Sequence, residues 1–206
     1  MPKKAFFNLP ESRRQDMVTK TMQLYVDHAY EEVTLKRILE KLSLNPASFY
    51  RYFEDKDELY LYATQVLYEK VDQHLRENYE DFDYEIFTFY ENVPVMSDLE
   101  RAFSKTYMKA PCDVMLRGYM EIYKGWLSAK YKRGLRHLRY EGLLRPDTDD
   151  DLIAFMYATT MFNMILYFRE SGIEDEAFQS KIKKYFYMSF FKYGILNRAE
   201  DETTTQ

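Results

Sequence analysis

Two helix-start signals only 11 residues apart constrain the fold of this chain more than any other feature. Thr34 has the residue type and the place of an N-cap for a short helix over 35–42, because its hydroxyl can accept an otherwise unpaired backbone N–H. After a two-residue turn, Asn45 is a second cap and Pro46 stands at the first helical position, where proline is favoured. The helix that follows, over 46–53, is too short to bury much surface. Two short helices joined by a tight turn indicate a helix-turn-helix.

The side chains of the second short helix divide into two sets. Phe49 and Phe53 lie four residues apart and share one face, so we expect them to close a small core. Small residues at the start of the helix would let it approach base edges. Tyr50, Arg51 and Tyr52 can donate hydrogen bonds to phosphates without reading sequence. The pattern therefore predicts a surface that binds double-stranded DNA.

Helical patterns continue along the chain, and few residues interrupt them. There are six glycines and six prolines in 206 residues, and β-branched runs are few, which favours helices over sheets. The expected helices span 11–28, 35–42, 46–53, 56–79, 98–109, 112–118, 119–141, 149–170 and 175–197, with 80–96 as an irregular connection. The predicted fold class is all-α, with a three-helix helix-turn-helix DNA-binding domain over 1–56, a helical effector-binding and dimerisation domain over 57–198, and a disordered tail over 199–206.

Charge is distributed unevenly between these two expected domains. The chain has a net charge of −5, but residues 1–56 carry ten Lys and Arg against eight Asp and Glu, a net of +2. The remainder carries 19 basic against 26 acidic residues, a net of −7. A positive end on an acidic body suits a modular DNA-binding protein that is held off non-specific sites.

Several function classes find no support in the sequence. The three histidines are scattered without metal-ligand spacing, and there is no glycine-rich phosphate loop or nucleophile elbow. We therefore expect no metal site, no cofactor and no enzymatic activity. Cys112 is the single cysteine, which excludes an intramolecular disulfide and favours a reducing compartment. The first residues hold no apolar run of signal-peptide length, so we expect a cytoplasmic protein.

A longer pattern surrounds the two short helices. It consists of Tyr25, Ala29-Tyr30, Thr34, Ile38, Leu42-Ser43-Leu44-Asn45, Ser48-Phe49-Tyr50-Arg51-Tyr52-Phe53, Lys56 and Leu59. Over these roughly 35 residues the chain resembles the signature of the TetR family of transcriptional regulators. The resemblance implies that Thr34 and Lys56 contact phosphates. It also implies a DNA face lined by Lys36, Pro46, Ala47, Ser48, Tyr50, Arg51 and Tyr52.

The chain departs from the family pattern at two places. The family usually has glycine at the positions of Ala29 and Ser43. If Ser43 adopts a left-handed conformation, it costs about 1 kcal/mol relative to glycine. Members also often carry Gly-Thr at the positions of Ala47 and Ser48, which bears on the bases that are read.

The C-terminal part contains an uncharged stretch of 17 residues over 152–168. A helix that is apolar all round is normally buried on every side; the alternative, a membrane span, would be at the lower limit of length. The last helix also has a wide apolar face. Two such helices from each of two subunits would form a four-helix interface, as the last two helices do in TetR-like proteins. We therefore expect a homodimer, without a membrane, with Phe155, Phe162, Phe178, Ile182, Phe186 and Phe190 at the interface.

Residues 57–206 also hold 28 aromatic side chains in 150 positions, more than a modest helical core needs. We expect a ligand pocket between the helix over 56–79 and the helix that holds Trp126. The candidate lining residues are Tyr62, Val66, Phe103, Tyr107, Met115, Tyr119, Tyr123, Trp126 and Met161. Each of them could equally be ordinary core, since pockets are mostly apolar.

Together these patterns predict a repressor that a small apolar or aromatic effector releases from a palindromic operator. Two alternatives stay open. One is a DNA-binding protein without a small-molecule effector, and the other is an all-helical carrier of apolar ligands.

Overall fold

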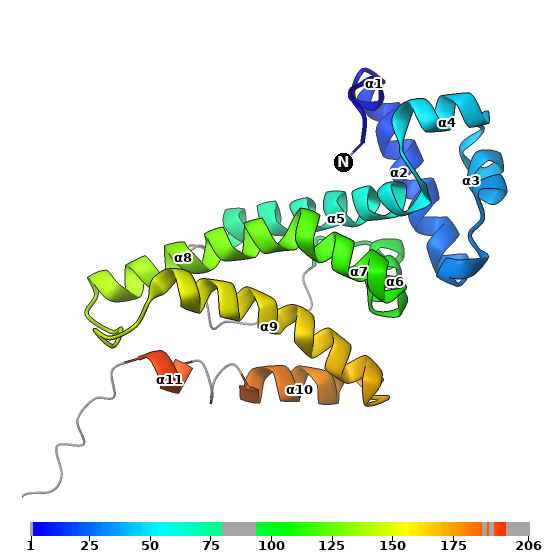
Figure 1. Cartoon of the computed structure of the whole chain (residues 1–206). Coiled ribbons are helices and arrows are strands. Elements are labelled where there is room, and N and C mark those ends of the chain that lie inside the picture. The colour runs from blue at the N-terminus through cyan, green and yellow to red at the C-terminus, as the bar shows by residue number, and fades with distance from the viewer. Residues whose placement is uncertain (1, 80–93, 187–188, 190–191, 197–206) are drawn as a thin grey trace, which may run out of the picture. The chain divides into compact units, whose positions relative to one another are not determined.

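The computed structural model describes residues 2–79, 94–186, 189 and 192–196, and it confirms the all-α prediction. Among these residues the regular elements are helices, and an isolated antiparallel bridge joins Leu144 to Leu196. Figure 1 shows the helices along the chain. They pack into two compact units, one with the described residues up to 77 and from 94 to 118, the other with residues 78–79 and those from 119 onward. The expected irregular connection over 80–96 and the tail over 199–206 lie wholly or mostly outside the described residues.

The first unit holds the N-terminal helices and the long helix that follows them. Its elements are α1 (Lys4–Phe7), α2 (Glu11–Asp27), the 3₁₀ turn η1 (Tyr30–Glu32), α3 (Leu35–Leu42), α4 (Pro46–Tyr52), α5 (Lys56–Asn78), α6 (Asp98–Thr106), the 3₁₀ turn η2 (Tyr107–Lys109) and α7 (Cys112–Gly118). The second unit has η3 (Tyr119–Tyr123), α8 (Lys124–Tyr140), α9 (Asp150–Glu170), α10 (Glu176–Phe186) and α11 (Tyr193–Ile195). The η3 segment, expected as the first turn of an α-helix, is π-helical.

The short helices α3 and α4 begin where the sequence places their caps. The Thr34 hydroxyl accepts the backbone N–H of Arg37 at 3.3 Å, and the Asn45 side chain accepts that of Ser48 at 2.8 Å. Such caps satisfy donors that a helix start otherwise leaves unpaired. Between the helices, Ser43 has φ +53° and ψ +51°, which is the left-handed conformation.

A small aromatic and aliphatic core fills the space between α1, α2, α3, α4 and the start of α5. Phe49 and Phe53 are fully buried, as their spacing predicts, together with Ile38 and Leu42. Phe6 of α1 is also fully buried there. Helix α1 was not predicted, because four residues are too few to show a helical period.

A second layer of tyrosines connects α2 to α5. The rings of Tyr25, Tyr30 and Tyr60 contact each other with centroids 4.6 to 5.2 Å apart, and Tyr60 contacts Phe103 of α6 at 5.5 Å. The Tyr60 hydroxyl lies 2.9 Å from the Thr106 hydroxyl. This cluster joins the helix-turn-helix to α5 and α6 within one unit.

In the second unit, α8 and α9 pack along each other. Tyr131 and Leu135 of α8 share a core with Ala154 and Tyr157 of α9, and the Tyr131 and Tyr157 ring centroids are 4.2 Å apart. An ion pair between Arg139 and Asp150 fixes the end of α8 to the start of α9.

Helix α9 is unusually apolar on the surface that this core leaves uncovered. Its mean hydropathy over an 18-residue window is 1.3, yet only 29% of that window is buried. By length and composition alone it is the one helix of the described chain that is long and apolar enough to cross a membrane, a test that core helices also pass. The helix therefore has an apolar surface that one copy of the chain does not bury.

Candidate nucleic-acid interface

One face of the helix-turn-helix carries the predicted DNA-contacting side chains. Pro46, Ala47, Tyr50 and Arg51 are exposed on α4, Ser48 is half-buried at its start, and Thr34 and Lys36 are exposed at the start of α3. Half of the Tyr50 side chain is accessible to solvent. Hydroxyl, guanidinium and ammonium donors on two adjacent short helices are the groups that position a protein on phosphates and base edges.

Tyr52 departs from this prediction. Its side chain is only 6% exposed, and its ring packs against Phe6 with centroids 6.2 Å apart. The hydroxyl accepts a hydrogen bond from Arg51 at 2.8 Å, and the Arg51 guanidinium lies 5.1 Å from the Tyr52 ring centroid. Tyr52 therefore belongs to the core and supports Arg51. Spacing alone missed this, because it could not show that a further helix covers the end of α4.

Lys56 also has an internal role that the family resemblance did not indicate. Its ammonium donates to the backbone carbonyls of Tyr30 and Val33, both at 3.1 Å, and lies 4.6 Å from the centroid of the Tyr30 ring. These contacts link the first residue of α5 to the end of η1. A phosphate contact by Lys56 stays a prediction, and the geometry gives the ammonium a structural function.

Burial controls the ionisation of the tyrosines behind this face. It raises the pKa of Tyr25, Tyr30 and Tyr60 well above 10. Tyr30 also donates to the Asp57 carboxylate at 2.5 Å, a contact that raises its pKa further. On α2, a hydrogen bond from Lys20 lowers the pKa of Asp16. The support of the helix-turn-helix is thus an uncharged, hydrogen-bonded layer.

Comparisons with known proteins agree with this geometry. Residues 18–63 match the family model of the bacterial regulatory proteins of the tetR family, and this range contains α3, α4 and the start of α5. The chain therefore carries the DNA-binding domain of the TetR family of transcriptional regulators. No curated protein matched the chain in a sequence comparison.

Solved structures show that the family likeness extends to the fold. SmeT, the repressor of the Stenotrophomonas maltophilia multidrug efflux pump SmeDEF, is 15% identical, with a TM-score of 0.54 over 90% of this chain and 91% of SmeT. A putative TetR family regulator from Shewanella sp. PV-4 is 14% identical, with a TM-score of 0.50 over 90% of this chain and 99% of that chain. At such identities the likeness establishes the fold alone.

The residues expected to line a ligand pocket divide between the two units of the chain. In the first unit, Phe103, Tyr107 and Met115 are buried, and the Tyr107 hydroxyl donates to the Met115 carbonyl at 2.7 Å. Val66 is half-buried. Tyr62 is also half-buried, but its ring contacts Phe6 and Phe7 of α1 at 5.1 and 6.1 Å. Tyr62 thus packs against α1, and its assignment to the pocket stays a prediction.

In the second unit, Tyr119 is buried, and its ring stacks on that of Phe162 with centroids 4.9 Å apart. The Tyr119 hydroxyl oxygen lies 3.1 Å from the Thr159 hydroxyl oxygen. Trp126 is half-buried. The side chains of Tyr123 and Met161 lie outside the described residues. The pocket as a whole therefore stays a prediction.

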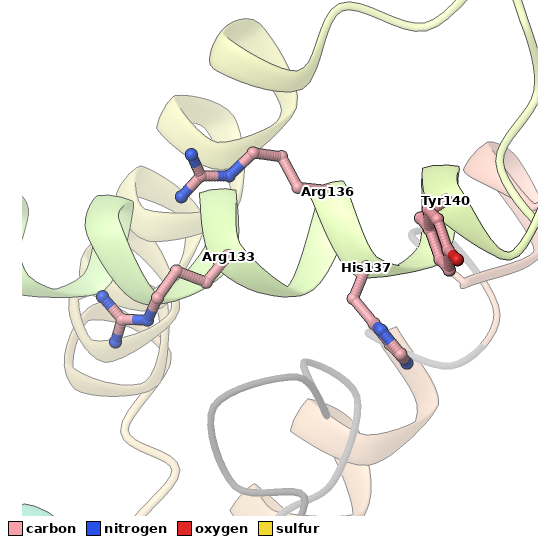
Figure 2. A pocket seen from close by; sticks show the side chains of 4 residues that line it. All are labelled: Arg133, Arg136, His137 and Tyr140. Carbon is pink, nitrogen blue, oxygen red and sulfur yellow. The ribbon is translucent and has the colours of Figure 1, made fainter.

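A surface depression of about 330 Å³ on α8 has a different character. It is lined by Arg133, Arg136, His137 and Tyr140, and Figure 2 shows these four side chains along the one helix. None of the nine expected pocket residues takes part. Helix α8 has six Lys and Arg and no acidic residue, although the part of the chain after residue 56 is acidic. Two arginines, a histidine and a tyrosine therefore line this depression, and not the aromatic and methionine side chains that were expected for the pocket.

The expected interface residues on α9 and α10 differ in exposure. Phe155 and Phe178 are 45% and 49% exposed, whereas Phe162, Ile182 and Phe186 are half-buried. Phe186 packs against the core of the second unit. Phe190 lies outside the described residues. Within the described part of α10 no residue is buried, so its apolar face is available to another surface.

Two contacts that sequence reasoning missed connect α7 to the start of α5. Arg117 of α7 donates to the Asp55 carboxylate at 2.9 Å, and Asp55 also accepts the backbone N–H of Glu58 at 2.6 Å. A Cβ added to Gly118 would lie 2.8 Å from a methyl carbon of Leu61 and 2.9 Å from the Tyr107 hydroxyl oxygen. Arg117 and Gly118 lie 11 to 62 residues away from their partners Asp55, Leu61 and Tyr107 in the chain, so no local pattern could reveal these contacts.

Proposed function

We propose that this TetR-family regulator is a homodimeric repressor that binds a near-palindromic operator and leaves it when a small effector binds. The observation that carries the proposal is the capped helix α4, which presents exposed donors on one face and is buried on the other. A single helix of seven residues makes too few contacts for nanomolar specificity. Two copies would place two such helices in successive major grooves, about 34 Å apart.

The exposed apolar surface of α9 and α10 supports the dimer. Phe155, Met156 and Phe178 are each between 45% and 49% exposed, together with Leu152 at 58%. Apolar surface of this extent on a soluble regulator is normally covered by a partner. A second copy of the same chain would cover it symmetrically and would supply the second recognition helix.

The effector part of the proposal follows from the way α5 is held. Its first residue, Lys56, contacts η1, while the same helix contacts α6 through Tyr60 and α7 through Leu61. A ligand that displaces α6 or α7 would therefore shift α5 and the helix-turn-helix with it. Because a duplex fixes the spacing of two half-sites, a shift of a few ångströms would weaken binding. A repressor of this kind acts where bacterial DNA lies, in the cytoplasm.

Binding-site selection from random DNA with the purified full chain tests the DNA-binding part. We expect enrichment of a near-palindrome with half-site centres about 10 base pairs apart or a multiple of that. Substituting Ser48→Ala should change the enriched sequence more than the affinity, and Lys36→Ala should weaken all duplexes alike and flatten the salt slope by about one unit. Enrichment of no sequence would contradict operator binding.

Lys56→Met tests the internal role of that side chain in the same assay. If the ammonium only holds η1, the variant loses thermal stability and operator affinity while its salt slope is unchanged. A salt slope reduced by about one unit would instead support the phosphate contact that the family resemblance implies for Lys56. Lys36→Ala is the control, since its side chain is 85% exposed.

Reciprocal coupling tests the effector. Candidate apolar and aromatic compounds are titrated while Trp126 fluorescence and operator affinity are followed in parallel. A true effector should weaken operator binding by about 5- to 150-fold, and operator DNA should weaken effector binding by the same factor. A compound that quenches Trp126 and leaves operator affinity unchanged binds the chain without acting as the switch.

A further inference from the structure

The recognition helix α4 has an end that its own residues do not complete. The last four carbonyls of any helix lack partners within it. In α4, the Phe49 carbonyl accepts the backbone N–H of Phe53 at 2.8 Å, which is ordinary chain continuation. The carbonyls of Tyr50 and Tyr52 are both satisfied by one residue far away in the sequence, Lys3.

Lys3 closes this end with two hydrogen bonds. Its backbone N–H donates to the Tyr52 carbonyl at 2.9 Å, and its ammonium donates to the Tyr50 carbonyl at 2.8 Å. A cation at a helix C-terminus also interacts favourably with the helix dipole. The residue thus supplies both a main-chain cap and a charge to the helix that presents Tyr50 and Arg51.

Phe6 anchors the same segment in the core. It is fully buried, and its ring centroid lies 4.9 Å from that of Phe53 and 5.1 Å from that of Tyr62 on α5. The ring therefore occupies the corner where α4 ends and α5 follows. Removing it would leave a cavity at that corner and loosen the angle between the two helices.

We propose that residues 3–7, named here the N-terminal clasp, position the recognition helix and so determine operator affinity and specificity. The clasp lies before residue 18, where the match to the family model begins. The proposal rests on the proposed operator binding. It assigns to Lys3 and Phe6 a positioning role, exerted through α4 rather than through contact with DNA.

Adjacent residues offer matched controls. Lys3 and Lys4 carry the same charge one residue apart, but within the described chain the Lys4 ammonium makes no hydrogen bond or ion pair. Phe6 and Phe7 are likewise neighbours, yet Phe7 is 42% exposed. Any effect of net charge or of apolar content should be shared within each pair, and an effect of the clasp should not.

The test measures the affinity of the full chain for two duplexes by fluorescence anisotropy at fixed salt. One is the duplex enriched from a random pool by the wild-type chain, and the other is a scrambled duplex of the same composition. We expect Lys3→Met to weaken binding to the enriched duplex about three- to fivefold more than Lys4→Met does. On the scrambled duplex the two variants should be equal. Lys3→Arg, which keeps a cationic donor, should recover most of the loss.

Phe6→Leu and Phe7→Leu extend the test to the ring, with melting followed by circular dichroism. The Phe6 variant should lose affinity for the enriched duplex while the Phe7 variant does not. If Phe6→Leu does not fold, the Lys3 and Lys4 variants decide. Equal losses for Lys3→Met and Lys4→Met on both duplexes would overturn the clasp.

A readout without DNA separates the clasp from the proposed function. Backbone amides at the end of α4 should exchange with deuterium faster in Lys3→Met than in Lys4→Met, because the cap is lost in one variant only. If the wild type enriches no duplex but this difference appears, operator binding fails and the clasp stands. Identical exchange in the two variants would overturn the clasp.

Discussion

The two units of the chain bury their apolar side chains to different degrees. In the first unit, Phe6, Phe49, Phe53 and Phe103 are each at most 1% exposed. In the second, α9 and α10 contain more than 30 residues, and large apolar side chains such as Phe155 and Phe178 stay nearly half exposed. The first unit therefore buries its large apolar side chains within one chain, and the second leaves part of its apolar surface exposed.

This difference separates two ways of using aromatic residues. In the helix-turn-helix they determine the positions of short helices that could not be stable alone. In the proposed dimer, those on α9 and α10 would provide contact area, which is the property needed at a symmetric interface. The experiments below test whether this distinction holds.

The largest effect should come from charging the exposed surface of the second unit. Phe155→Asp or Phe178→Asp should give monomers in sedimentation at micromolar concentration. Since two linked recognition helices bind far more tightly than one, operator affinity should fall about a hundredfold or more. Tyr140→Asp on α8, an exposed aromatic residue outside α9 and α10, is the control. A wild-type chain that is already monomeric would contradict the assignment of this surface.

Raising the pH tests whether the tyrosines of the first unit stay buried and protonated as long as the chain is folded. Burial raises the pKa of Tyr25, Tyr30, Tyr60 and Tyr107 above the ordinary value of 10.0. Each then contributes stability that is complete below pH 10 and decreases as the pH rises above it, by about 1 kcal/mol per tyrosine at pH 11. Tyrosinate absorbance and the helical circular dichroism signal should change together. If all tyrosines ionise while the helical signal persists, solvent reaches these tyrosines in the folded chain and the layer is not buried.

Two glycines allow packing to be compared between the units. Gly118→Ala should destabilise the chain by about 1 to 3 kcal/mol, since a Cβ there would meet Leu61 and Tyr107 below 3.0 Å. Gly125→Ala on α8 has no neighbour within 4 Å and should stabilise the helix by about 0.5 to 1 kcal/mol. Denaturant unfolding measures both. A neutral Gly118→Ala would mean that α7 packs loosely on α5.

The smallest effect concerns the turn of the helix-turn-helix. Ser43 is the only non-glycine residue with positive φ in the described chain. Ser43→Gly should therefore stabilise the fold by about 1 kcal/mol, measured as a rise in melting temperature. Ser43→Ala retains the Cβ and should give no such gain. If both variants melt at the wild-type temperature, the turn stores no strain.

Local signals explain what could be predicted from the sequence. Caps at Thr34 and Asn45 act over three residues, so α3 and α4 begin where the sequence indicated. In each case the interaction that determines the structure lies within a few residues of the pattern.

What could not be predicted depends on long-range contacts. Lys56 reaches carbonyls 23 and 26 residues away, and Lys3 reaches one 47 residues away. Tyr52 is buried because α1 packs against it, and α1 is too short to show a helical period in the sequence. The adjacent phenylalanines at 6 and 7, in an otherwise polar segment, were the available signal.

The contacts of Lys3 and Phe6 also decide where this DNA-binding module can be cut for transfer to another regulator. A graft limited to residues 18–63, the part that the family model matches, would carry α3 and α4 but leave α1 behind. In the transplanted module, the Tyr50 and Tyr52 carbonyls would lack the hydrogen bonds from Lys3, and the missing Phe6 ring would leave a cavity beside Phe53. An exchangeable cassette from this chain must begin at residue 3, and an affinity tag belongs at the other end of the polypeptide.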